Sequence, residues 1–215
     1  MFIVAGTAGG VGCTTVAAAL ALHSARRART LLVDLDGDAS VLLGARAPVV
    51  GLGEWSVAPH PPPDALRRLE CQVGERLWLL APGAEPLVLD GGRASLLARL
   101  LDADERIVVV DGGRLDLLPS PMAEAPGELV VVTRLCHLGL RRGRDAVAVL
   151  DRPVAGVVVV AEPGRILTVG DAGEALAAPV RVLLRWDPAR LGHHDDTCDR
   201  SIENGHRIPT PSEAE

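Results

Sequence analysis

The chain has 215 residues, which suits one α/β domain with a sizeable core. Its formal net charge of -6 argues against nucleic-acid binding as the main role, so we do not expect a nucleic-acid partner. No apolar run reaches the ~20 residues needed to span a bilayer, so we expect no transmembrane segment.

Short apolar runs alternate with helical patterns along the chain. The runs expected to form strands are residues 2–5, 30–34, 77–80, 107–110, 128–133, 154–160 and 180–184. The segments expected to form helices are residues 14–29, 64–71, 93–101, 138–150 and 171–177. Because the apolar runs are continuous rather than alternating, each strand should be buried on both faces. The pattern therefore predicts an α/β fold: a mostly parallel, doubly wound sheet with helices on both faces.

Two polar stretches interrupt or follow this pattern. The proline-rich stretch 48–64 should be a loop, with or without one short helical turn, in which Trp55 either contacts a partner or caps the core. We expect one domain over residues 1–192 and a polar, mobile C-terminal tail over residues 193–215. The tail carries side chains with metal-ligand chemistry, but their spacing matches no closed zinc pattern, so a polar tail is favoured. These side chains are His193, His194, Asp195, Asp196, Cys198 and His206.

The usage of basic residues and of cysteine is unusual and informative. The sequence contains no lysine, so all 22 basic residues are arginines. The 4 cysteines are scattered without a Cys-x-x-Cys pair. We therefore expect free thiols in a reducing compartment and a cytoplasmic protein.

A glycine-rich loop joins the first expected strand to the first expected helix. Its candidate nucleotide-binding residues are Gly9, Gly10, Val11, Gly12, Cys13, Thr14 and Thr15. Glycines let successive backbone N–H groups turn toward one anion, and the helix N-terminus adds a favourable dipole. Asp34 and Asp111 each end a strand at the same edge of the sheet, where such folds bind ligands. Thr14, Asp34 and Asp111 are the candidate Mg²⁺ ligands; the alternative is a glycine turn that only packs strand against helix.

These motifs resemble those of the ParA/MinD family of deviant Walker A ATPases, over residues 1 to about 192. The family loop reads Lys-Gly-Gly-x-Gly-Lys-Thr-Thr; here Ala8 stands at the signature lysine and Cys13 at the phosphate-loop lysine. The resemblance implies a P-loop NTPase fold of the SIMIBI type, a homodimer, and ATP or ADP with Mg²⁺ as ligand. It also implies that Asp34 orients the attacking water and that Asp111 supports Mg²⁺ through water.

The loss of both lysines predicts weak or absent ATP hydrolysis, and a loop that binds nucleotide poorly or binds none. Arg114 and Arg134 follow strands near the expected site, where they either replace the lysines or are solvated loop charges. Cys13 lies at a helix N-terminus, so it is either a redox-sensitive thiol with a lowered pKa or a small tolerated residue.

Within the family, residues 78–82 and 110–115 resemble the corresponding sequence segments of the pilus-assembly branch (TadZ/CpaE-like). The first hypothesis is therefore a localisation or assembly scaffold for a pilus or secretion apparatus. Its partners would be proteins of that apparatus or of a cell-positioning system, and a partner would recruit it to the membrane or pole. Arg141, Arg142 and Arg144 either form a solvated helix face or touch DNA or an acidic partner.

Two other hypotheses keep the same fold. One is an active ATPase switch for DNA partitioning or division-site placement. The other is a ligase like dethiobiotin synthetase, because residues 4–14 also resemble the opening of that enzyme and of related amide-forming ligases.

Overall fold

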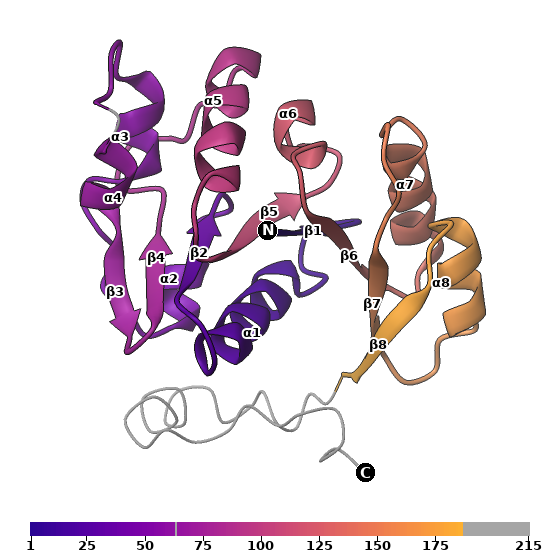
Figure 1. Ribbon diagram of the computed structural model, residues 1–215. Helices are drawn as coiled ribbons and strands as arrows, with labels where there is room; N and C mark the ends of the chain where they lie inside the picture. Colours follow the sequence, from indigo (N-terminus) through magenta and orange to yellow (C-terminus); the bar gives the residue numbers. More distant parts are fainter. Residues whose placement is uncertain (63, 187–215) are drawn as a thin grey trace.

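The computed structural model describes residues 1–62 and 64–186 and consists of one twisted sheet between two layers of helices (Figure 1). The eight strands lie in the order β3-β4-β2-β5-β1-β6-β7-β8. The strands are β1 (Phe2–Gly6), β2 (Thr30–Asp34), β3 (Cys71–Gly74), β4 (Leu77–Leu80), β5 (Ile107–Arg114), β6 (Glu128–Arg134), β7 (Gly156–Ala161) and β8 (Val180–Arg185). The helices are α1 (Cys13–Ala25), α2 (Ala39–Leu42), α3 (Leu52–Val57), α4 (Ala65–Leu69), α5 (Gly91–Asp102), α6 (Ser120–Ala123), α7 (His137–Val147) and α8 (Val169–Ala175).

All neighbouring strands are parallel except β3 and β4, which form an antiparallel hairpin at one edge. The mostly parallel α/β fold expected from the sequence is thus confirmed. The hairpin strand β3 was not expected, because Cys71–Gly74 alternates between half-buried and exposed residues and shows no continuous apolar run. The expected helix over residues 64–71 ends at Leu69, and Cys71 already opens β3. Helices α2 and α6 have four residues each, too few to show a helical period.

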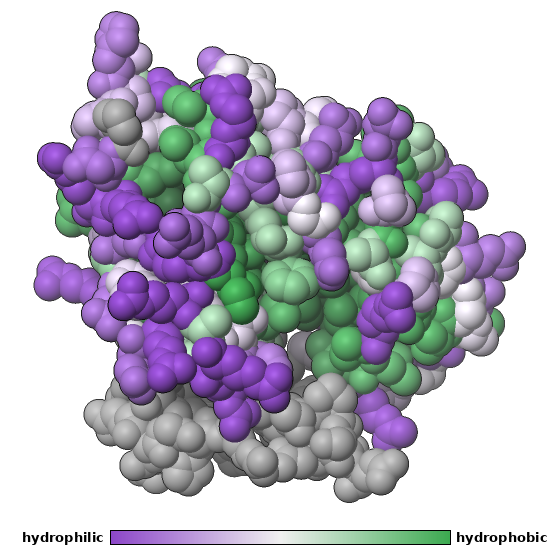
Figure 2. Space-filling view, viewed as in Figure 1, coloured by the Kyte–Doolittle hydropathy of each residue, from purple (hydrophilic) through white to green (hydrophobic). Residues whose placement is uncertain are grey.

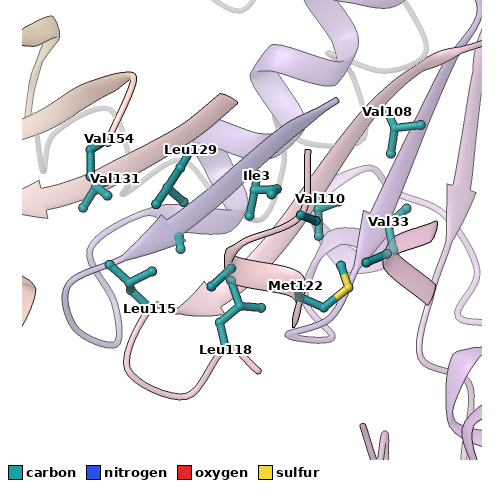
Figure 3. Close-up of a cluster of buried hydrophobic side chains, with 14 of the residues drawn as sticks. Ile3, Val33, Val108, Val110, Leu115, Leu118, Met122, Leu129, Val131 and Val154 are labelled. Atoms are coloured by element: carbon teal, nitrogen blue, oxygen red, sulfur yellow. The ribbon is translucent and has the colours of Figure 1, made fainter. Parts of the chain in front are cut away.

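The sheet buries a separate apolar core on each face. One core packs the sheet against α3 to α8 and contains Ile3, Val33, Val110, Met122 and Leu129, several of which meet near the centre of the sheet (Figure 3). The other packs alternate residues of the same strands against α1 and α2 (Figure 1). There Ala17, Ala18 and Ala21 let the backbone of α1 approach the sheet closely. The sheet therefore fixes the loop between β1 and α1 at the edge where the parallel strands end.

Trp55 belongs to the core and is not a partner contact. Its side chain is 3% exposed, and the Arg93 guanidinium lies 4.9 Å from its ring centroid. The neighbouring Glu54 accepts hydrogen bonds from the backbone N–H groups of Gly51 and Glu85. The proline-rich stretch is therefore fastened to the domain at Glu54 and Trp55, and the partner-contact hypothesis for Trp55 is wrong.

None of the helices in the described part of the chain is long and apolar enough to cross a membrane. The expected tail over residues 193–215, with its candidate ligands from His193 to His206, lies outside the described residues.

Candidate functional site

The loop between β1 and α1 has the shape of a phosphate-binding loop. Gly10 and Gly12 have φ angles of 70° and 96°, which lie in the left-handed region that favours glycine. A Cβ on Gly9 or Gly10 would meet nothing within 4 Å, so this part of the loop is open. At its base, the N–H of Thr7 donates to the Val132 carbonyl, and its hydroxyl lies 2.9 Å from that of Thr133.

Cys13, which the sequence resemblance places at the position of the phosphate-loop lysine, points inward and is held by the sheet. Its thiol donates to Asp111 Oδ1 at 3.1 Å and lies 3.3 Å from the Val4 carbonyl. Burial raises the pKa of this thiol far above its ordinary value, and the nearby Asp111 carboxylate raises it further. Of the two interpretations of Cys13, the redox-sensitive thiol with a lowered pKa is therefore wrong, which leaves the small tolerated residue. Cys13 stays protonated and neutral, so it brings no positive charge to the loop.

Asp111 leaves one carboxylate oxygen without a partner. Its side chain is fully buried, and Oδ1 accepts from Cys13 and, at 3.2 Å, from the Gly113 N–H. Oδ2 has no hydrogen-bond partner among the described residues. Leaving a buried carboxylate oxygen unpaired is costly, and a cation or its bound water would satisfy it. With the Thr14 hydroxyl next to Cys13, these groups fit Mg²⁺ held largely through water.

Asp34 lies beside Asp111, its register partner on β5, but it has a different set of contacts. Its Oδ1 accepts from the N–H groups of Asp36 and Gly37, and its Oδ2 accepts from the N–H of Ala39 at 2.9 Å. Burial raises the pKa of Asp34 above its ordinary value, and these hydrogen bonds oppose that shift. Both oxygens therefore organise the loop after β2.

Asp36 adds a further negative charge to this edge, which sequence analysis did not single out. Its pKa is raised by partial burial and by the charges of Asp111 and Asp38. A Cβ on Gly113 would lie 2.6 Å from Asp36 Oδ1, which places this carboxylate against the end of β5. The alternating Asp-x-Asp-x-Asp run from Asp34 to Asp38 was the signal. In the described residues, no three His, Cys, Asp or Glu side chains gather closely enough to hold a metal alone.

The two arginines considered as replacements for the lysines, Arg114 and Arg134, form ion pairs with neighbouring carboxylates. Arg114 binds Asp116 at 2.5 Å, and Arg134 binds Glu162 at 2.8 Å while lying over the Trp186 ring. The edge thus brings together Cys13 and Asp111, with Asp34 and Asp36 alongside, and both candidate arginines are paired with neighbouring carboxylates.

Comparison with known proteins agrees with this architecture. Residues 2–188 match the family model "CobQ/CobB/MinD/ParA nucleotide binding domain". No significant match was found among the curated proteins.

Three solved structures illustrate the breadth of similar folds. The ParA family ATPase from Chlorobium tepidum TLS has a TM-score of 0.71 at 19% identity, covering 89% of this chain and 86% of that one. The cell division protein MinD from Aquifex aeolicus has a TM-score of 0.71 at 18% identity, covering 97% and 98%. Cobyrinic acid a,c-diamide synthase from Mycobacterium smegmatis, with a bound ATP analog and magnesium, has a TM-score of 0.59 at 22% identity, covering 97% of each chain.

At these identities the structures establish the shared fold. The family model covers residues 2–188, which is most of the chain. The chain therefore belongs to the CobQ/CobB/MinD/ParA nucleotide-binding domain family.

Proposed function

We propose that this chain is a ParA/MinD-like scaffold that positions or assembles a pilus or secretion apparatus, with weak or absent ATP hydrolysis. The observation that carries the proposal is the hydrogen bond of 3.1 Å from the Cys13 thiol to Asp111. At the lysine position, a neutral donor is turned toward the protein's own carboxylate. The loop is thus held by a contact within the chain that needs no phosphate.

The missing charge weakens nucleotide binding. A charge-assisted hydrogen bond contributes about 1.5–3 kcal/mol, so its loss lowers ATP affinity by about one to two orders of magnitude. The carboxylates of Asp34, Asp36 and Asp111 remain and repel a triphosphate unless Mg²⁺ accompanies it. The loss in hydrolysis is larger, because phosphoryl transfer depends mainly on stabilising charge in the transition state.

The rival function is an active ATPase switch for DNA partitioning or division-site placement. The loop glycines, Thr14 and the unpaired Asp111 oxygen favour it, because this is the arrangement a Mg²⁺–nucleotide complex would use. Turnover assays separate the two functions. Our proposal predicts Mg²⁺-dependent ATP hydrolysis that is weak or absent and does not support a switch, whereas sustained turnover abolished by Thr14→Ala would establish the switch. Asp34→Ala is a poor control, because Asp34 accepts hydrogen bonds from three backbone N–H groups and its loss would also disturb the loop after β2.

The scaffold role is tested in cells. A fluorescent fusion of the full chain should form foci where the apparatus assembles. Those foci should persist in the Thr14→Ala variant, because positioning does not depend on nucleotide. Foci that disperse in Thr14→Ala but persist in Arg26→Ala, a change at an exposed residue just after α1, would contradict the scaffold proposal and support the switch.

A further inference from the structure

Helices α7 and α8 pack side by side on the sheet face opposite α1 (Figure 1). Residues of α7, of α8 and of the segment before α8 line a shallow groove. The groove has a volume of about 360 Å³. Leu140, Leu167 and Ala175 form its apolar lining, and Arg141 and Arg144 lie along one side. On the side of the molecule where α7 and α8 lie, hydrophilic and hydrophobic residues are mixed on the surface (Figure 2).

The arginines of this groove are only weakly neutralised. Arg141 and Arg144 share a single carboxylate, Asp145, at 3.9 Å and 3.3 Å, and all three side chains are more than half exposed. Such exposed pairs contribute little. The one acid in the lining, Asp171, already accepts hydrogen bonds from the N–H and hydroxyl of Thr168. The groove is therefore suited to an acidic segment that also carries an apolar side chain.

We propose that this groove binds the chain's own segment 195–203. That segment contains four carboxylates, a single arginine and Ile202. Its charge complements Arg141 and Arg144, and Ile202 matches the apolar lining. Binding within one chain also has the advantage of a high effective concentration.

The described chain ends close enough for this contact. The N–H of Trp186 donates to the Ala161 carbonyl, and the Arg134 guanidinium lies 5.1 Å from the Trp186 ring centroid. Arg134 ends β6, and α7 begins at His137. The nine residues from Trp186 to Asp195 span up to about 30 Å when extended, which is enough to pass around the sheet edge to the groove.

Binding at this groove would also affect the phosphate loop. A Cβ on Gly143 would lie 2.5 Å from Thr7 Cγ2, so α7 presses directly on the residue at the base of the loop. A Cβ on Gly139 would lie 3.4 Å from the Thr7 hydroxyl. An occupied groove would thus hold α7 against Thr7. The inference depends only on α7, α8 and the tail sequence, and it stands apart from the proposed function.

The test is amide hydrogen exchange on the full chain. In the wild type, residues 195–203 and the start of α7 should exchange more slowly than their intrinsic rates allow. Arg141→Glu/Arg144→Glu should speed exchange in 195–203 by about threefold to tenfold, the effect of losing two exposed charge pairs. Arg142→Glu is the matched control, because it makes the same change on the same helix at a residue that does not line the groove.

Rescue by charge exchange gives the second arm. Adding Asp195→Arg/Asp196→Arg to the Arg141→Glu/Arg144→Glu variant should restore slow exchange. Three results would overturn the inference: unprotected exchange of 195–203 in the wild type, an equal effect of Arg142→Glu, or protection that grows with protein concentration. The last result would assign the groove to a second copy of the chain.

Discussion

The carboxylates at the two opposite edges of the sheet differ in whether an arginine neutralises them. At the edge where strands begin, Arg106 binds Glu70 through two nitrogens at 2.6 and 2.7 Å and Asp104 at 2.7 Å, and it lies over Trp78. At the edge where strands end, Asp111 keeps an oxygen without a described partner, and the pKa values of Asp34 and Asp36 are raised. The first edge is satisfied within the chain and contributes to stability. At the second edge, no described cation neutralises these carboxylates, which is typical of a ligand-binding site.

The largest expected effect is at the satisfied edge. Arg106→Ala should lower the free energy of unfolding by about 3 kcal/mol, because it leaves two largely buried carboxylates without their cation. Urea denaturation measures the change. Arg68→Ala is the control, because its pair with Asp64 is exposed and should cost less than about 0.5 kcal/mol. Equal effects of the two substitutions would show that the Arg106 cluster is not a stabilising element.

Asp34→Ala should lower the free energy of unfolding by about 2 kcal/mol, because three backbone N–H groups lose their acceptor. The same denaturation experiment on Asp38→Ala, an exposed neighbour, should show little change. A stable Asp34→Ala protein would mean that Asp34 does not organise the loop after β2.

Asp111→Asn should have the opposite sign. It removes the charge of a buried carboxylate with an unpaired oxygen, so it should raise the free energy of unfolding by up to about 1 kcal/mol. Asp104→Asn, the same change at the satisfied edge, should destabilise the fold, because Asp104 binds Arg106. If both substitutions destabilise the protein equally, the contrast between the two edges fails.

The smallest effect concerns pH. Asp34 and Asp36 have folded-state pKa values above the ordinary 3.8, so the folded state gains protons more readily than the unfolded one. Stability should therefore rise as pH falls from neutral through those raised values, and their contribution should be complete near 3.8. Asp104 has a lowered pKa, so its stabilising contribution is lost only below 3.8. The Tm should increase as the pH falls from about 7 toward 3.8, and less so in Asp36→Asn. A Tm that falls over this range, or an equal slope in the variant, would contradict the assignment.

Much of the fold could be predicted, because short, continuous apolar runs rich in Val, Ile and Leu, such as residues 30–34 and 107–110, favour strands buried on both faces. The strand β3 could not, since at a sheet edge only alternate residues are half-buried. At the site, the glycine loop and the aspartates could be predicted as motifs. Their contacts could not be predicted, because the inward position of the Cys13 thiol and the hydrogen bonds from backbone N–H groups to Asp34 depend on the folded structure.

The central claim is that Cys13 replaces the lysine with a contact inside the chain. Calorimetric titration with ATP and Mg²⁺ tests it on the wild type, on Cys13→Ala and on Ala8→Lys/Cys13→Lys. We predict little or no binding heat for the first two, and binding at least about tenfold tighter for the double lysine variant. Tight ATP binding by the wild type, with the same affinity in the double lysine variant, would contradict the account. It would show that other groups already bind the phosphates in place of the lysines.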